Sequence, residues 1–274
     1  MNSLEYCYEK AAPVGSTFYY SVKNLKVPER DVIVAITAFY KELDAIIFSY
    51  TDIGVARAQF NFWRDEVIKL TEGKPEHPVS IALQKSAQSF SLPTFRLIEL
   101  IDGVEENLSF SCFDSFEDVV IALMRTAGVR ELLIAEVFHF SEKEVVYQLM
   151  LVIELVNFMQ NLRRFVSRGL IYFSKDELLR CRVTESAVLA VKTTPEIKNL
   201  LRGQAEKVER AYLKAQELLS PASRSGLSSL LIRADIARAL CKEIAASDFR
   251  VMEEFIDLTP LRKWWISRKF KNRV

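Results

Sequence analysis

Apolar residues recur at intervals of three and four along almost the whole chain, which is the spacing of one buried helix face. The clearest run predicts a helix from Pro28 to about Tyr50, with proline in its first turn. A second helix is predicted over about 55–70, and two shorter helices begin at Pro78 and Pro93. The first third of the chain is therefore expected to be helical.

Capping signals mark further helix starts. Ser115 with Asp118 and Ser141 with Glu144 have the spacing of a capping box, which predicts helices of about 22 and 26 residues. The second helix, over 145–166, is apolar on nearly every side and is expected at the centre of a domain. Three more starts are predicted at Thr194-Pro195, Ser220-Pro221 and Thr259-Pro260.

The composition agrees with an all-α fold. Gly and Pro together make up 16 of 274 residues, about half the usual share of about 12%. Only the stretch 169–191 lacks regular periodicity, and it is expected to be a loop with a short helix from Ser174. No Pro-, Gly- or Ser-rich linker divides the chain, so residues 1–274 are expected to form one domain, a helical bundle around the central apolar helix.

Charge and glycine spacing exclude several function classes. With 37 Lys and Arg against 36 Asp and Glu, the chain lacks the basic excess of a general nucleic-acid binder. The closest glycines, Gly54 and Gly73, lie 19 residues apart, which excludes every Gly-rich phosphate-binding loop. No nucleic-acid partner and no nucleotide cofactor are therefore expected.

The cysteines and the apolar stretches indicate where in the cell the protein is expected. The four cysteines lie at least 60 residues apart and only two histidines accompany them, so a zinc site is not expected and the thiols fit a reducing compartment. The N-terminus lacks the apolar core of a signal peptide, and no apolar stretch approaches the roughly 20 residues of a membrane span. A cytoplasmic protein, at most peripheral to a membrane, is expected.

Five groups of short motifs carry a resemblance that covers nearly the whole chain. They are STFYY (16–20) with VPER (27–30) and AFYKELD (38–44); FWR (62–64) with GKPEHPV (73–79); AG (127–128); LVN (155–157) with RGLIY (168–172); and LTPLRK (258–263). In this order they are similar to the motifs of the squalene/phytoene synthase family of head-to-head prenyl transferases. The resemblance implies an all-α isoprenoid-synthase-type fold around a deep apolar cavity.

The resemblance also implies a reaction, the Mg²⁺-dependent condensation of two prenyl diphosphates. In the family, two DxxxD motifs on facing helices place carboxylates one turn apart, where hard oxygen ligands hold Mg²⁺ against diphosphate. Carried over by position, the first motif falls on Asp44 and Phe48, and the second on Asn161 and Phe165. Phenylalanine cannot bind Mg²⁺ and asparagine offers a neutral oxygen, so the sequence predicts neither catalytic residues nor a metal site.

Instead, the sequence predicts a site that binds a ligand. The resemblance places Lys41 where the family usually has a diphosphate-contacting arginine, and it retains Asn157. The expected ligand-binding residues are Phe18, Tyr19, Lys41, Asp44, Phe48, Asn157, Asn161, Arg163, Arg164 and Phe165. We expect helix 145–166 to line an elongated pocket with Phe18, Ile47 and Phe158, which Phe48 and Phe165 shorten.

Two hypotheses of function stay open at this stage. The first is a non-condensing relative that binds an isoprenoid or lipid ligand, or a protein partner. The alternative is an active prenyl transferase or prenyl diphosphatase with an atypical metal site, and only this alternative requires Mg²⁺. The alternative is favoured if two of the acids Glu42, Asp44, Asp52 and Glu154 face each other across the cavity.

Basic residues leave two further alternatives open. Arg163, Arg164 and Arg168 can bind a phosphate directly, or they are solvated cations at a helix end. Residues 262–273 hold six cations, two tryptophans and no acid. This tail either faces an anionic membrane surface or is a terminal helix that packs Trp264 or Trp265 on the core.

Overall fold

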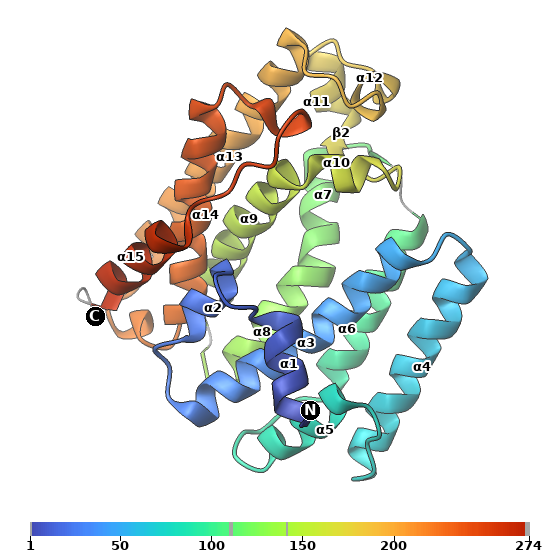
Figure 1. The fold of residues 1–274 in the computed structure, drawn as a ribbon, viewed down its shortest axis with the longest axis vertical. Coiled ribbons are helices and arrows are strands. Elements are labelled where there is room, and N and C mark those ends of the chain that lie inside the picture. The colour runs from blue at the N-terminus through green and yellow to red at the C-terminus, as the bar shows by residue number, and fades with distance from the viewer. Residues whose placement is uncertain (1, 110–111, 141, 272–274) are drawn as a thin grey trace.

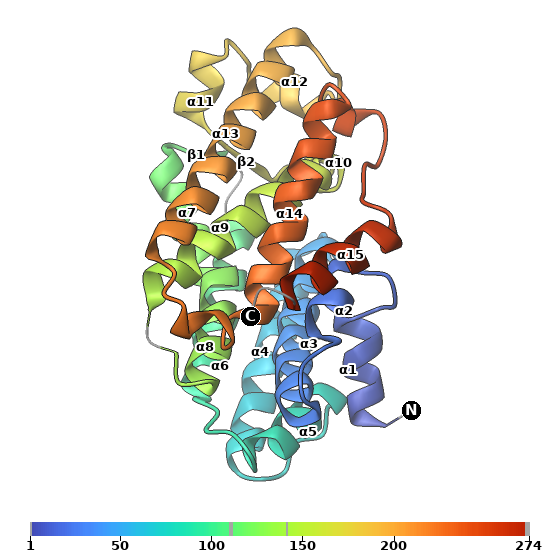
Figure 2. The same cartoon turned by 90° about the vertical axis from the view of Figure 1, so that its left-hand side faces the viewer.

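The computed structural model describes residues 2–109, 112–140 and 142–271. Almost all of this chain is helical (Figures 1 and 2). The N-terminal helices are α1 (Ser3–Ala11), α2 (Thr17–Val22), α3 (Val27–Ser49), α4 (Ile53–Thr71), α5 (Pro78–Ala87) and α6 (Phe95–Glu106). The later helices are α7 (Phe116–Leu123), α8 (Val129–Val137), α9 (Lys143–Gln160), α10 (Leu162–Val166), α11 (Lys175–Arg180), α12 (Glu185–Leu189), α13 (Pro195–Leu218), α14 (Ser228–Ala246) and α15 (Pro260–Lys271).

Helix α9 lies at the centre, as its apolar sequence predicts. It packs against α13 and α14 on one side and against α7 and α8 on the other (Figure 1). Its residues join one of two apolar clusters, while α3 and its neighbours α1, α4, α5 and α6 form the other. Phe165 and Tyr172 pack against both clusters, so the boundary between the two runs past these side chains.

The predicted helices of the first half are confirmed within a few residues. Pro28 stands in the first turn of α3, and Pro78 begins α5. Ser115 caps α7 with the expected capping box to Asp118. The helix that follows runs to Val137 through a π-helical turn, Met124–Gly128, which joins α7 to α8.

This π turn depends on a close approach at Gly103 of α6. A Cβ atom added to Gly103 would lie 2.0 Å from the carbonyl oxygen of Arg125, well inside van der Waals contact. A residue larger than glycine would therefore push α6 away from the π turn. The wider turn leads directly into Arg130 and Glu131 of α8, which are both buried.

Two helix boundaries differ from the prediction. The apolar helix does not continue to 166, because Asn161 breaks it into α9 and α10 with φ −103° and ψ 21°. The Asn161 side-chain amide donates to the backbone oxygen of Asn157 at 3.0 Å, a local bond that competes with helix continuation. The predicted start at Ser141 lies outside the described residues.

Ser220-Pro221 also does not open a long helix. A 3₁₀ turn, Ala222–Arg224, follows it, and α14 begins only at Ser228. The hydroxyl groups of Ser220 and Ser223 both lie within hydrogen-bond distance of Glu142, which holds this turn apart from the helix. The local side-chain bonds thus delay the helix start.

The irregular stretch 169–191 contains a short strand that the sequence analysis did not predict. Strand β2 (Ile171–Ser174) pairs in parallel with β1 (Cys112–Phe113). The expected short helix from Ser174 is confirmed as α11, which Ser174 caps together with Glu177. No helix in the described part of the chain is long and apolar enough to cross a membrane.

Candidate functional site

Two adjoining pockets lie beside α9, between it and α3. The inner pocket has a cavity volume of about 40 Å³ and the outer pocket one of about 210 Å³. Since a cavity needs roughly 10–15 Å³ to admit one water molecule, the inner pocket has room for only a few waters and the outer pocket for many more. Both pockets are lined by Tyr40, Asp44, Glu154, Asn157 and Phe165.

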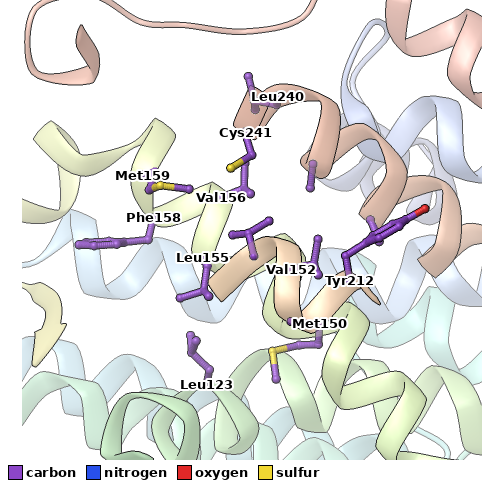
Figure 3. Close-up of a cluster of buried hydrophobic side chains, with 14 of the residues drawn as sticks. Leu123, Met150, Val152, Leu155, Val156, Phe158, Met159, Tyr212, Leu240 and Cys241 are labelled. Carbon is purple, nitrogen blue, oxygen red and sulfur yellow. The ribbon is translucent and has the colours of Figure 1, made fainter. Parts of the chain in front are cut away.

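The predicted elongated pocket is therefore present but divided. Ile47 and Phe158 line the inner pocket, while Phe18 lines the outer one. Figure 3 shows Leu123, Leu155 and Phe158 among the apolar side chains around α9, and these three also line the inner pocket. The inner pocket is thus continuous with the central apolar core.

Aromatic rings in edge-to-face contact line the pockets: Phe165 lines both, and Phe48 and Tyr172 line the inner one. The ring centroids of Phe48 and Phe165 are 5.5 Å apart, and those of Phe165 and Tyr172 are 5.4 Å apart. The guanidinium carbon of Arg164 lies 3.7 Å from the centroid of the Phe48 ring. Phe48 and Phe165 hold the second positions of the two motifs, so these positions do face each other across the site, as the resemblance implies.

A buried network of charged side chains forms the floor of the outer pocket. Arg233 donates to both carboxylate oxygens of Glu131, at 2.7 and 2.5 Å. Arg130 donates to Glu131 at 2.8 Å and to Glu154 at 3.1 Å. Burial alone would raise the pKa of Glu131, but the two guanidinium groups outweigh it and lower the pKa to about 2.

The pKa of Asp44 is shifted in the opposite direction from that of Glu131. Its pKa is raised, mainly because burial disfavours the carboxylate, with Glu154 adding repulsion. Lys41 and Arg164 act in the other direction and lower the pKa. The half-buried carboxyl group of Asp44 therefore stands between two cations and a second acid, in a place from which water is partly excluded.

The structure brings together most of the expected ligand-binding residues. Phe18, Lys41, Asp44, Phe48, Asn157, Arg164 and Phe165 line one or both pockets. Three expected residues lie apart from these linings. Tyr19 makes an edge-to-face contact with Tyr20 and lies under Lys23, Arg163 is exposed, and Asn161 forms the break between α9 and α10.

Of the four acids considered as ligands, two line the pockets. Asp44 and Glu154 do so, and Glu154 also accepts hydrogen bonds from Arg130 and Asn157. Glu42 instead pairs with Lys10 at 3.0 Å, and Asp52 caps α4. These two acids serve the fold and contribute nothing to the pocket lining.

The cations at the floor of the pocket were not predicted from the sequence. Arg130 and Arg233 are only 4% and 5% exposed, although arginine is usually a surface residue. Arg233 stands inside an apolar run, LLIRADI, and that context was the available signal, whereas Arg130 in VREL is followed directly by an acid and carries no such signal. Tyr40, whose ring lies 4.4 Å from the Arg130 guanidinium carbon, was also missed.

The side chains at the motif positions do not fit a Mg²⁺ ion with diphosphate. Among the described residues, no three His, Cys, Asp or Glu side chains are placed to hold a metal ion together. The outer pocket offers Asp44 and Glu154, and it also contains four cations: Lys41, Arg130, Arg164 and Arg233. This donor set suits an anion better than a divalent cation, which needs several oxygen ligands.

Comparison with known proteins gives consistent matches. A family model described as squalene/phytoene synthase matches residues 5–265. The phytoene synthase of Arthrospira platensis is 23% identical over 232 residues, 79% of this chain and 75% of that protein. The chloroplastic phytoene synthase of Narcissus pseudonarcissus is 23% identical over 255 residues, 89% of this chain but 60% of that protein. The chain thus spans less than two thirds of the plant protein.

Solved structures share the fold. A dehydrosqualene synthase in complex with a ligand superposes with a TM-score of 0.81 at 18% identity, covering 99% of this chain and 96% of the other. The squalene synthase HpnC from Alicyclobacillus acidocaldarius gives 0.76 at 17% identity, covering 90% and 94%. These similarities confirm the predicted all-α isoprenoid-synthase-type fold.

Proposed function

Since this chain belongs to the squalene/phytoene synthase family, we propose that it binds one isoprenoid or related lipid with an acidic head group and does not condense two. The contact between Phe48 and Phe165 carries this proposal. Two phenyl rings fill the place where carboxylates would have to face each other to hold metal ions. A leaving diphosphate would therefore lack the metal that neutralises its developing charge.

The outer pocket supplies the groups that such a ligand requires. Lys41 and Arg164 contact aromatic rings there, and their cations can pair with a phosphate. Arg130 and Arg233, by contrast, are already paired with Glu131 and Glu154, so their charge is balanced within the network. The apolar side chains of Phe18, Ile236 and Leu240 offer a surface for the hydrocarbon part. The head group would then lie near α10 and the chain along α14.

One observation favours the alternative, an active prenyl transferase or prenyl diphosphatase. Asp44 and Glu154 line the same two pockets, and two carboxylates are the minimum for an atypical metal site. Arg130 already occupies one oxygen of Glu154, and Asn157 the other. We therefore rank this alternative second.

The four free thiols support a reducing compartment such as the cytoplasm.

Binding of farnesyl phosphate and farnesyl diphosphate, each with Mg²⁺ and with a chelator, tests the proposal. We expect the affinity to be the same with Mg²⁺ and with the chelator. We expect Arg164→Gln to weaken the affinity at least tenfold, because it removes one hydrogen bond to a charged group. Arg163→Gln is the matched control, because Arg163 is a neighbouring arginine that is also exposed but lies outside the pocket lining. Binding that requires Mg²⁺, or equal losses in both variants, would contradict the proposal.

A product assay separates binding from condensation. Incubation of the protein with farnesyl or geranylgeranyl diphosphate and Mg²⁺ is expected to yield no squalene, presqualene diphosphate or phytoene. Metal-dependent formation of any of them at about 1 per second, or within a few decades of that rate, would establish the alternative instead.

A further inference from the structure

Helix α15 is held on the body of the protein by two polar residues and one aromatic residue. Lys263 and Ser267 are 5% and 2% exposed, and Phe270 is 6% exposed. The Lys263 ammonium donates to Asp257 at 2.6 Å, and the Ser267 hydroxyl donates to the backbone oxygen of Tyr20 at 2.8 Å. These contacts fix which face of the helix points inward.

The opposite face of α15 presents the large apolar side chains to solvent. Leu261 is 72% exposed, Trp264 36% and Trp265 56%. The tail is a terminal helix packed on the body, as the second alternative expected, but Lys263, Ser267 and Phe270 take the inward positions in place of the tryptophans. The cations of Arg268 and Lys269 lie one turn further on, 5.4 and 5.1 Å from the two indole rings.

We propose that this face of α15, formed by Leu261, Trp264, Trp265, Arg268 and Lys269, docks on the surface of an anionic lipid bilayer. Indole rings favour the level of the lipid head groups, and cations beside them pair with anionic phosphates. The sequence from 258 to 274 contains no Asp or Glu, so nothing within the tail opposes an anionic surface. Arg262, at the edge of the face, pairs with Glu243 and is not counted toward docking.

The charge of the face argues against a second copy of this chain as its occupant. An isologous contact would bring Arg268 and Lys269 of one copy toward the same cations of the other, since both copies present the same patch. Like charges in such a contact repel each other. A bilayer with anionic head groups offers the opposite charge together with an apolar layer for the indoles.

Docking would also bring the outer pocket close to the bilayer. Helix α15 packs on α2 and α14 (Figures 1 and 2), and these helices supply Thr17, Phe18, Arg233 and Ile236 to the pocket lining. A ligand that partitions into lipid could then enter from the membrane side. The docking itself does not depend on which ligand the pocket binds.

Sedimentation of the full chain with vesicles tests the inference. The vesicles are phosphatidylcholine alone and phosphatidylcholine mixed with phosphatidylglycerol. We expect binding only to the anionic vesicles, and weaker binding as salt rises, since exposed charges are screened over roughly 8–10 Å. The double variant Arg268→Gln and Lys269→Gln should lower the partition coefficient about thirtyfold, the effect of two cations near an anionic surface.

Two controls keep the test informative. The variant Leu179→Ser with Arg180→Gln removes an exposed apolar residue and an exposed cation from α11 and should bind like the wild type. Trp63 is buried, so a vesicle-induced blue shift of tryptophan emission must arise from Trp264 and Trp265. Replacing both with alanine should abolish binding while the thermal unfolding temperature stays unchanged.

Three results would overturn the inference. The first is equal sedimentation of the wild type and the Arg268→Gln, Lys269→Gln variant. The second is an unshifted tryptophan emission in the vesicle-bound fraction. The third is retention on a soluble polyanion such as heparin without binding to anionic vesicles, which would assign the face to an acidic macromolecule.

Discussion

Replacing Glu131 with glutamine is the sharpest test of the charge network under the outer pocket. The substitution keeps the size of the side chain and removes its charge. Arg130 and Arg233 would then share a buried site with only Glu154 as a charged partner. Breaking a buried ion pair by removing one partner typically costs 3–5 kcal/mol, because the remaining charge stays uncompensated.

The pKa of Glu131 gives an independent magnitude. It falls from 4.5 to about 2 in the folded protein. Since each tenfold change in proton affinity is worth about 1.4 kcal/mol, the carboxylate contributes about 3 kcal/mol to stability at neutral pH. Glu131 is 1% exposed, so solvent screens this contribution little. The cost of a broken buried ion pair and the pKa shift both indicate that Glu131→Gln lowers the free energy of unfolding by about 3 kcal/mol or more.

The pH dependence follows from the direction of the shift. A carboxyl group with a lowered folded pKa stabilises the protein above its unfolded pKa, and this stability is lost as pH falls toward the folded value. The difference between wild type and Glu131→Gln should therefore be constant above about pH 4.5 and shrink between there and about pH 2.

Urea denaturation of both proteins across this pH range measures the effect. The matched control is Glu106→Gln, which breaks the exposed Glu106–Arg125 pair and should cost about 1 kcal/mol at most. A loss in Glu131→Gln no larger than in this control would refute the reasoning. So would a stability difference that has already disappeared at pH 6.

Three further outcomes are expected. Gly103→Ala should lose about 3 kcal/mol of unfolding free energy in urea denaturation, because its Cβ would meet the Arg125 carbonyl oxygen, whereas Gly203→Ala, with open space around it, should gain up to about 1 kcal/mol. Phe48→Ala should enlarge the inner pocket, which Phe48 lines, and raise the affinity for geranylgeranyl phosphate relative to farnesyl phosphate in a binding titration. Affinity for farnesyl phosphate should fall as pH rises through the raised pKa of Asp44, because the ionised carboxylate repels the phosphate. The variant Asp44→Asn should remove this pH dependence in the same titration.

The helices could be predicted because their signals are local. Pro28, the Ser115 capping box and the apolar stretch of α9 each act within a few residues of themselves. The break at Asn161 could not be placed in this way. Asparagine is compatible with a helix, and its side-chain bonds to the backbone and side-chain oxygens of Asn157 at the break are visible only in the structure.

The site was predictable to the extent that the motifs describe it. The facing of Phe48 and Phe165 followed from two motif positions, and the structure places these rings in contact. The burial of Arg233 did not follow, because its partner Glu131 lies 102 residues away in sequence. The inward orientation of the Ser267 side chain likewise involves a hydrogen bond to the backbone oxygen of Tyr20, 247 residues away in sequence. Such pairings arise only when distant helices meet.

The position of the charge network bears on function as well as on stability. Replacing a buried group of ion pairs by well-packed apolar residues is often neutral or stabilising, so the fold alone does not require Arg130, Glu131 and Arg233. Both arginines line the outer pocket, and Glu131 fixes both of them there through the bonds that hold its own pKa low. Guanidinium groups fixed in this way can meet an acidic head group without having to rearrange when the ligand binds, although Glu131 and Glu154 balance their charge. The network therefore supports a site built for an anion.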